Sequence, residues 1–518
     1  MKKGLRFLPV ALFAAVTLLD LLLQQRGGAD GGFAFTHPLM DCARLLLNAL
    51  KYGLLWGAFG LLMGRWARVL YLPLWIWMCF LETAEIFARR YYNMVLDGDW
   101  LMLVLASSVA EMREMFAGFG PLAVLLGLGG FALAASAGGW ALWRATDARA
   151  TRRSVACGII CLAPFFVWNV IVRPLDIALS NTLYTFLPVD TACNWSEFSD
   201  IARTAQAPEL PAGLRAPPRG GDRPFGLFVI GESATRAHWD LYGYGRSTTP
   251  CLVGLRDELT VFGDVSATDA FTGKSLRMLL TEAKLESPAR TRSTLAQQLA
   301  AAGLRSRLIS AQSRWGRWEG PETLLFSGCE DKTYLSELPG RATGTEGPFD
   351  GDLLPLLDAA LAETNAPDAV FLHLMGSHTP THCRYPPRCT VYPRHTGDVP
   401  PGTDAADAPA RARIDTYDNS IRYTDGVLGE LVNRLKARKG PSFLLYLSDH
   451  GETPDGPAWR DASRPELLQV PFVIWFSPAY RAAHPDVVAE VQRMAELPLR
   501  LDHALPLMRQ LMCVEAGR

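Results

Sequence analysis

The sequence predicts two parts, an α-helical membrane domain followed by an α/β domain, and three observations support this prediction. The chain has 518 residues, which is too long for a single ordinary core. Its first third contains long apolar runs, each near the roughly 20 residues that a bilayer-spanning helix needs. The rest alternates short apolar runs with helical patterns, which is typical of a mixed sheet covered by helices on both faces.

Five apolar runs predict five membrane spans. They lie at about Phe7–Gln24, Leu45–Met63, Val69–Phe87, Phe116–Trp143 and Val155–Val172. Basic residues precede the first run, as in a signal peptide, but no small-residue cleavage site follows it and four further runs do. We therefore expect the first run to be a retained span.

The positions of basic residues predict the orientation of these spans. Alternate loops carry most of them: Lys2, Lys3, Arg6, Arg65, Arg68, Arg144, Arg149, Arg152 and Arg153. Because loops rich in lysine and arginine stay in the cytoplasm, an odd number of spans brings everything after Val172 to the outer side of the membrane.

The α/β domain is expected to begin near Phe225. We assign residues 1–175 to the membrane domain, 176–224 to a bridging segment and linker, and 225–518 to a catalytic α/β domain. The linker assignment rests on residues 207–224, where five prolines stand among glycines and arginines.

Apolar runs and helical patterns predict the elements of this second domain. Predicted strands are Phe225–Ile230, Ser306–Ser310, Ala369–Leu374, Ser442–Leu447 and Val470–Phe476; predicted helices or helix starts are Thr294–Ala302, Leu353–Glu363, Tyr417–Arg438 and Pro465–Gln469.

Three potential metal ligands follow two of the predicted strands. Glu232 comes directly after the first strand, and Asp449 and His450 come after the run Ser442–Leu447. Carboxylate oxygens and imidazole nitrogens are ligands that zinc takes readily, and strand ends on one side of a sheet can meet at one ion. A helix-capping aspartate and a glutamate facing water would explain the same residues one by one.

A polar loop, residues 264–275, leads into a helix-like segment and offers hydroxyl nucleophiles. Thr272 would lie near the amino end of that helix, where backbone amides favour an anion. A hydroxyl bound to zinc loses its proton more easily and can attack phosphorus. Thr272 could instead cap the helix, and Thr268, Ser275 or Thr281 would serve almost as well as the nucleophile.

Histidines and cysteines add further candidates. His378, after the strand that ends near Leu374, could bind a phosphate oxygen or a second metal. We expect His373 to be a strand residue, buried or half-buried, with its hydrogen bonds satisfied. We expect His238 to be a surface or loop residue. Cys383 and Cys389 bracket a short proline-containing loop that a disulfide could close in an oxidising compartment.

The formal net charge of −1, with no basic stripe, predicts no nucleic-acid partner.

Five ordered motifs resemble the membrane-bound phosphoethanolamine transferases of the alkaline phosphatase and sulfatase superfamily. They begin at Ile230 (Ile-Gly-Glu-Ser-Ala-Thr-Arg), Leu241 (Leu-Tyr-Gly-Tyr-Gly-Arg-Ser-Thr-Thr-Pro), Leu374 (Leu-Met-Gly-Ser-His), Tyr417 (Tyr-Asp-Asn-Ser-Ile-Arg-Tyr-Thr-Asp) and Leu447 (Leu-Ser-Asp-His-Gly-Glu). The resemblance implies five amino-terminal spans in the bacterial inner membrane and an alkaline-phosphatase-like α/β domain in the periplasm.

The resemblance also assigns roles to residues. It places the zinc ligands on Glu232, Asp449 and His450, the nucleophile, itself a zinc ligand, on Thr272, and a substrate-side catalytic histidine on His378. Two departures stand out. No histidine lies between residues 453 and 464, so a second zinc is not implied, and Thr268 and Met278 stand where some members have cysteines.

The implied reaction moves phosphoethanolamine from phosphatidylethanolamine to an envelope acceptor, which is lipopolysaccharide core, lipid A or a periplasmic glucan. We expect Lys274 and Ser275 to contact the phosphate, and Glu85, Asn93 and Glu114 to guide the donor lipid. The alternatives are a phosphoglycerol transferase and a metal-dependent phosphatase or sulfatase.

Overall fold

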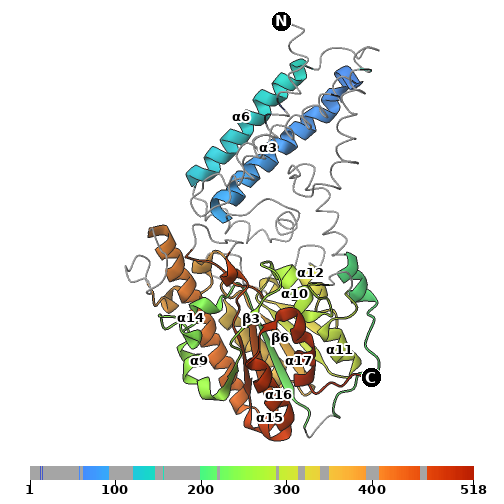
Figure 1. Ribbon diagram of the computed structural model, residues 1–518, viewed down its shortest axis with the longest axis vertical. Coiled ribbons are helices and arrows are strands. Elements are labelled where there is room, and N and C mark those ends of the chain that lie inside the picture. Colours follow the sequence, from blue (N-terminus) through green and yellow to red (C-terminus); the bar gives the residue numbers. More distant parts are fainter. Residues whose placement is uncertain are drawn as a thin grey trace. The chain divides into compact units, whose positions relative to one another are not determined.

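The computed structural model describes residues 62–92, 121–145, 199–218, 222–286, 291–312, 321–338, 349–392, 408–455 and 464–517, with four isolated positions before and between them (Figure 1). The chain divides into two compact units, one formed by residues 1–105 and 119–194 and the other by residues 106–118 and 195–518. The described part of each unit has its own core of buried apolar side chains.

Two long helices make up most of the described part of the first unit, α3 (Ala67–Tyr92) and α6 (Pro121–Ala145), and they pack along each other in Figure 1. Trp75 of α3 is buried and donates its indole N–H to the carbonyl of Ala134 at 3.1 Å. A β-carbon at Gly138 would lie 2.2 Å from this indole ring. The glycine therefore makes room for the tryptophan, as small residues do where membrane helices meet.

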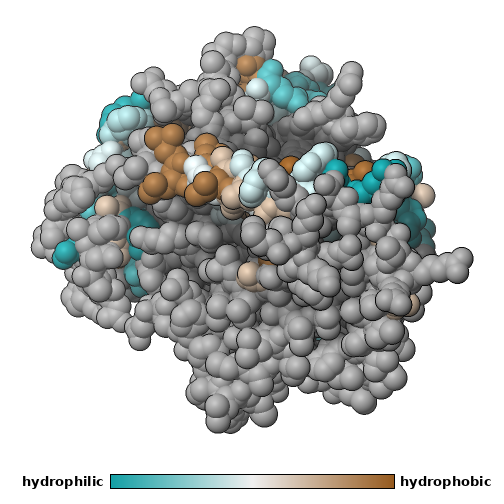
Figure 2. All heavy atoms as spheres, turned by 90° about the horizontal axis from the view of Figure 1, so that it is seen from above, coloured by the Kyte–Doolittle hydropathy of each residue, from teal (hydrophilic) through white to brown (hydrophobic). Residues whose placement is uncertain are grey.

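The outer faces of these helices are apolar. Large apolar side chains that are exposed on α6 include Leu125, Leu126, Leu128, Leu133, Trp140 and Trp143. Figure 2 shows a patch of apolar side chains, in brown, beside paler and hydrophilic residues. Within the described residues, the segment Leu125–Trp143 is long and apolar enough to cross a bilayer, whereas the apolar segment Ala67–Leu81 is shorter.

The third and fourth predicted spans thus coincide with helices α3 and α6. The first, second and fifth lie almost entirely outside the described residues.

A seven-stranded sheet forms the centre of the second unit, with strand order β2-β8-β7-β1-β6-β4-β5. Its strands are β1 (Phe225–Gly231), β2 (Leu259–Val261), β4 (Ser306–Ser310), β5 (Asp331–Tyr334), β6 (Ala369–His373), β7 (Ser442–Ser448) and β8 (Phe472–Phe476). Strands β7, β1, β6, β4 and β5 are parallel, and β8 and β2 extend the sheet in antiparallel register. A separate parallel pair joins β3 (Val265–Ser266) to β9 (Leu499–Arg500).

Alternate residues of the central strands enter two different cores. In β1, Phe228 and Ile230 belong to one core, and Leu227 and Val229 belong to the other. Every residue of β1 is buried, which explains why this strand reads as a continuous apolar run.

Helices cover both faces of the sheet (Figure 1). One face is covered by α10 (Thr272–Leu280), α11 (Leu295–Ala301), α15 (Pro478–Ala483), α16 (Pro485–Ala495) and α17 (Ala504–Leu511), and the other by α9 (Pro250–Gly254), α13 (Leu353–Ala362) and α14 (Ala408–Ala437). A four-residue helix α12 (Pro321–Leu324) and single 3-10 turns occupy the connections.

All five predicted strands are present within two residues of their predicted ends, and three predicted helices correspond to α11, α13 and α14. Pro465–Gln469 forms only a 3-10 turn, Pro465–Leu467. Strands β2 and β5 escaped prediction. Each is short, and β5 begins with the exposed Asp331, so neither reads as an apolar run.

Parts of the expected bridging segment and linker, residues 176–224, belong to the second unit and pack within it. Ile201 belongs to its core, and Arg215 pairs with Glu515 in an antiparallel bridge. The Cys383–Cys389 disulfide is not formed: the two cysteines end separate 3-10 turns, Thr381–Cys383 and Pro387–Cys389, and the extended backbone of Pro386 separates the turns.

Candidate metal and nucleophile site

Strand β1 delivers Glu232 to the carboxyl edge of the sheet, where it is 1% exposed. The chain turns sharply at the next residue, Ser233, whose φ of 55° lies in the left-handed region. The Ser233 hydroxyl donates to Glu232 Oε1 at 2.9 Å, and its backbone N–H donates to Asp449 Oδ1 at 3.0 Å. This turn therefore orients carboxylates from two different strand ends.

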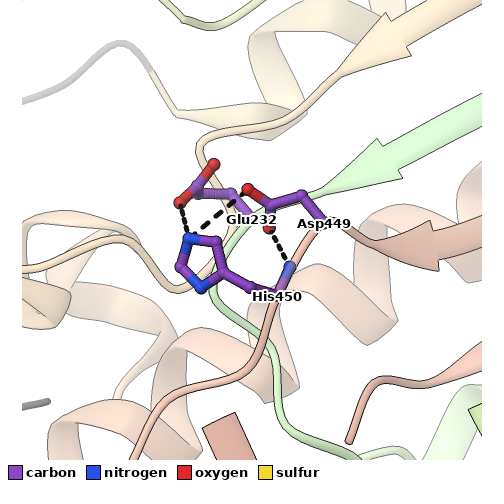
Figure 3. Close-up of side chains that lie close together, drawn as sticks. All are labelled: Glu232, Asp449 and His450. Carbon is purple, nitrogen blue, oxygen red and sulfur yellow. Dashed lines mark hydrogen bonds and ion pairs between the residues drawn. The ribbon is translucent and has the colours of Figure 1, made fainter. Parts of the chain in front are cut away.

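Asp449 and His450 follow β7, the parallel neighbour of β1, and both are buried. Figure 3 shows their side chains converging with that of Glu232. His450 Nε2 lies 3.3 Å from Glu232 Oε1 and 3.5 Å from Asp449 Oδ2, and one ligand atom from each of the three residues lies within 4.8 Å of the others. The three residues expected to be ligands thus lie together at this edge of the sheet.

The hydrogen-bonding state of these groups fits a metal ion. His450 Nδ1 donates to the carbonyl of Gly451 at 2.8 Å, so Nε2, which faces the two carboxylates, is the nitrogen that loses its proton when the ring binds a metal. Asp449 Oδ2 is buried and has no hydrogen-bond partner in the described part of the chain. A buried acceptor of this kind is costly unless a cation or donor satisfies it.

The charges of the two carboxyl groups are strongly coupled. Burial would raise the pKa of Glu232, but the hydrogen bond and the charge of His450, with the charge of His378, hold that pKa well below its ordinary value. Burial, followed by repulsion from Glu232, raises the pKa of Asp449 to about 7. A divalent cation would compensate the two carboxylates together.

Thr272 begins α10 and stands at this cluster. Its Oγ1 lies 3.1 Å from Glu232 Oε2, 3.2 Å from Glu232 Oε1 and 3.4 Å from His450 Nε2. Phe271, not Thr272, is the N-cap residue of this helix, and no side-chain hydrogen bond caps this end. The capping role considered for Thr272 is therefore wrong. The side chain of Thr272 is partly exposed, as a nucleophile must be.

The other candidate hydroxyls are engaged or buried elsewhere. Ser275 is fully buried and donates to the carbonyl of Asp449 at 2.6 Å, so its predicted contact with phosphate is wrong and it supports the ligand loop instead. Thr281 is also fully buried and donates to the carbonyl of Arg277. Thr268 is 8% exposed, and its hydroxyl has no partner among the described residues.

The loop after β6 carries His378 and is fastened to Glu232. The backbone N–H of Ser377 donates to the carbonyl of Glu232 at 2.9 Å. Buried Asp350 accepts from the N–H groups of Met375 and Gly376 at 2.7 and 2.9 Å. His378 Nδ1 donates to the carbonyl of Thr379 at 2.7 Å, and its charge contributes to the low pKa of Glu232.

We expect Gly376→Ala to lower the stability of the protein. Gly376 has a φ of 49°, and a β-carbon there would lie 2.7 Å from the carbonyl oxygen and 2.9 Å from the nitrogen of Glu232. Backbone atoms cannot move aside cheaply, so the cost should be about 1–3 kcal/mol, seen as a lower midpoint in thermal unfolding. Gly426→Ala is the matched control. Gly426 lies in α14 with open space around its α-carbon, so alanine should not lower the midpoint, and equal losses would contradict the account.

Sequence reasoning missed several supporting residues. Gln312 donates to Glu232 Oε2 at 3.4 Å and to the carbonyl of Leu374 at 2.9 Å; its position just after β4 is the signal that could have found it. His238 is buried against Asp418, with Nδ1 2.7 Å from Oδ1, and is not a surface residue. His373 is buried in β6 as expected, but its Nε2 has no partner among the described residues, and burial lowers its pKa to about 4.

The remaining predicted substrate residues are only partly visible. Lys274 is partly exposed in the first turn of α10. Asn93 and Glu114 lie outside the described residues, and only the helical backbone of α3 is described at Glu85.

Comparison with known proteins finds phosphoethanolamine transferases among the relatives of this chain. Phosphoethanolamine transferase EptC of Escherichia coli strain K12 is 31% identical over 286 residues, covering 52% of this chain and 48% of EptC. Phosphoethanolamine transferase CptA of Salmonella typhimurium is 31% identical over 287 residues, covering 53% and 49%. The chain thus spans about half the length of the curated relatives it matches.

Solved structures show the same fold. The carboxy-terminal periplasmic domain of E. coli EptC, crystallised in complex with Zn, matches with a TM-score of 0.52 and 27% identity, covering 60% of this chain and 87% of that one. The integral membrane protein EptA of Neisseria meningitidis matches with a TM-score of 0.69 and 19% identity, covering 98% and 96%, a likeness of fold.

The sulfatase family model matches residues 224–497, which is more than half of the sequence and contains all the residues of the site described above. The predicted superfamily is confirmed, and the chain belongs to the sulfatase family.

Proposed function

We propose that this protein transfers phosphoethanolamine from phosphatidylethanolamine to an acceptor of the bacterial envelope. The observation that carries the proposal is the position of the Thr272 hydroxyl, which lies within 3.4 Å of two residues of a buried ligand cluster. The names of EptC and CptA, which are similar to about half of this chain, support the choice of phosphoethanolamine as the transferred group.

Zinc is the proposed metal. Glu232, Thr272, Asp449 and His450 would hold it, and oxygen and nitrogen donors in this number suit zinc. When bound, zinc would make the Thr272 hydroxyl more acidic and offset the charge of the phosphoryl oxygens. The EptC domain crystallised with Zn supports this identity.

The proposed reaction has two in-line steps, and the first loads the threonine. Thr272 Oγ1 forms a bond to the phosphorus of phosphatidylethanolamine, and the bond from phosphorus to the glycerol oxygen breaks. The threonine proton passes to the Glu232 carboxylate, whose nearer oxygen lies 3.1 Å away. The departing diacylglycerol takes a proton from His378, which the loop after β6 holds near the cluster.

The second step transfers the phosphoethanolamine group from Thr272 to the acceptor. A hydroxyl oxygen of the acceptor attacks the same phosphorus and its proton passes to His378; a phosphate oxygen attacks as the anion, and His378 then regains its proton from solvent. The bond to Thr272 Oγ1 breaks, and Glu232 returns the proton to the threonine. Lys274, two residues after Thr272 in the first turn of α10, would neutralise the phosphate during both steps.

A lipid donor would explain why the α/β domain follows a membrane domain, because the donor lies in the bilayer. We propose five spans in the inner membrane, with the α/β domain in the periplasm, so that the lipid head group is presented at the membrane face. Glu85, Asn93 and Glu114 would receive its ammonium group. The apolar helix segment Leu125–Trp143 and the fold match to the integral membrane protein EptA support this arrangement.

Incubation of the full-length chain with fluorescent phosphatidylethanolamine tests the function. We expect diacylglycerol to be released and phosphoethanolamine to remain on the protein until an acceptor is added. Release of free phosphate would favour a hydrolase, and preference for phosphatidylglycerol would favour a phosphoglycerol transferase. Thr272→Ser is the matched control, since it keeps a hydroxyl at the same position and should retain activity.

Zinc should raise the thermal midpoint more at pH 8 than at pH 6. Because the pKa of Asp449 is raised to about 7, the folded metal-free protein holds a proton that the unfolded chain releases. The stability of the metal-free protein therefore falls as pH rises toward 7, where Asp449 becomes a buried negative charge. Bound zinc would compensate that charge. At pH 6 zinc must first displace that proton. Midpoints of chelator-treated and zinc-loaded protein at both pH values check this; an equal or larger zinc effect at pH 6 would refute it.

A further inference from the structure

Helix α14 supplies none of the proposed metal ligands, yet Tyr417 in this helix holds the turn that follows Glu232. Tyr417 is fully buried. Its hydroxyl donates to the carbonyl of Ser233 at 2.7 Å and accepts from the backbone N–H of Thr235 at 2.8 Å. One phenol oxygen thus bridges two backbone groups of the turn.

The turn needs such a clamp because of its backbone. Ser233 has a φ of 55°, a conformation that L-residues other than glycine rarely adopt and that persists only when surrounding contacts fix it. The same residue donates to both Glu232 and Asp449. If Ser233 relaxed, both carboxylates would lose the donor that aims them.

Tyr417 is itself fixed in place. The His238 ring stands nearly perpendicular to the Tyr417 ring, with centroids 5.1 Å apart. His238 Nδ1 lies 2.7 Å from Asp418 Oδ1, and Arg246 pairs with Asp418 Oδ2 at 2.8 Å. The phenol is therefore presented in one orientation, as a positioning group requires.

The next turn of α14 supports the other side of Glu232. Ser420, three residues after Tyr417, donates to the carbonyl of Tyr417 at 2.6 Å, and its Oγ lies 2.9 Å from Ser377 Oγ, within hydrogen-bond distance. The backbone N–H of Ser377 donates to the carbonyl of Glu232. One face of α14 therefore contacts the segments on both sides of this ligand.

We propose that Tyr417 is a positioning residue for the metal centre, and that its hydroxyl sets the affinity of the site by holding Ser233 in the left-handed conformation. The inference rests on the proposed metal-binding function of Glu232, Asp449 and His450. Outer groups that orient metal ligands typically change metal affinity by about 10–100-fold.

The test is the zinc affinity of the full-length chain in detergent, measured by competition with a chromophoric chelator. We expect Tyr417→Phe to bind zinc about 10–100-fold more weakly than the unchanged protein. Tyr446→Phe is the matched control, because Tyr446 is also fully buried but its hydroxyl has no hydrogen-bond partner among the described residues. Its affinity should be unchanged.

Tyr480→Phe controls for the loss of a buried hydrogen bond away from the site. Tyr480 donates to the carbonyl of Leu511 at 2.8 Å, so this change should lower stability and leave zinc affinity intact. Equal zinc affinity in Tyr417→Phe and the unchanged protein would overturn the inference. So would an equal loss of affinity in Tyr480→Phe, since the effect would then follow stability alone.

A glycine substitution tests the backbone part of the inference by comparing two variants that both carry Tyr417→Phe and so share any loss of stability that this change causes. Added to Tyr417→Phe, Ser233→Gly should recover more zinc affinity than Ser233→Ala, because glycine reaches a positive φ without strain. Equal affinities of the two double variants would overturn it. Glu232→Ala distinguishes failure of this inference from failure of the proposed metal site. If this variant binds zinc as tightly as the unchanged protein, the metal site itself is wrong.

Discussion

Thr272→Ala should abolish phosphoethanolamine transfer, with the rate falling by about four orders of magnitude or more. The substitution removes the oxygen that lies 3.1 Å from Glu232 Oε2 and leaves the three other ligands unchanged. Zinc should therefore still bind, more weakly by the loss of one ligand. Initial rates of diacylglycerol release from fluorescent phosphatidylethanolamine, with zinc content measured on the same samples, check both parts.

Thr281→Ala is the control for this variant. Thr281 follows the same helix, is fully buried and donates to the carbonyl of Arg277, so its loss should reduce stability and not the rate of the folded protein. If Thr272→Ala kept even a tenth of the activity, another group would have to be the nucleophile.

Glu232→Gln should remove the metal. A neutral amide is a poor ligand for zinc, and the loss in zinc affinity should exceed the roughly 100-fold that outer groups produce. Because the folded protein holds the pKa of Glu232 well below its ordinary value, the ionised carboxylate stabilises the fold, and the midpoint without metal should fall. Thermal unfolding with and without zinc measures both effects.

Glu282→Gln serves as the control, because it should lower the midpoint without affecting zinc binding. Glu282 is half-buried and accepts from Ser293 and Gln298 away from the ligand cluster. Its substitution should lower the midpoint and leave the zinc-induced rise unchanged. An unchanged zinc-induced rise in Glu232→Gln would exclude Glu232 as a ligand.

The sequence predicted the centre of the fold and the ligand cluster for one physical reason. Strands buried on both faces, such as β1 and β7, are continuous apolar runs, and parallel strands place their carboxyl ends at one edge. Glu232, Asp449 and His450 stand directly after such runs, so their meeting could be expected. Thr272 could not be chosen in this way, because its loop offered several hydroxyls.

The supporting contacts were beyond sequence reasoning because they join residues far apart in the chain. Nothing local in the sequence of α14 indicates that Tyr417 reaches Ser233, 184 residues earlier. The left-handed conformation of Ser233 was equally hidden, since serine rarely adopts it. Short strands such as β5, with an exposed polar residue at its start, lack the apolar pattern that revealed the others.

Mass spectrometry of the full-length chain after incubation with phosphatidylethanolamine and zinc, without an acceptor, tests the central claim most directly. The account predicts one phosphoethanolamine group per chain, located on the peptide that carries Thr272 and lost when an acceptor is supplied. A modification mapped to another residue, or diacylglycerol release with an unmodified chain, would contradict it.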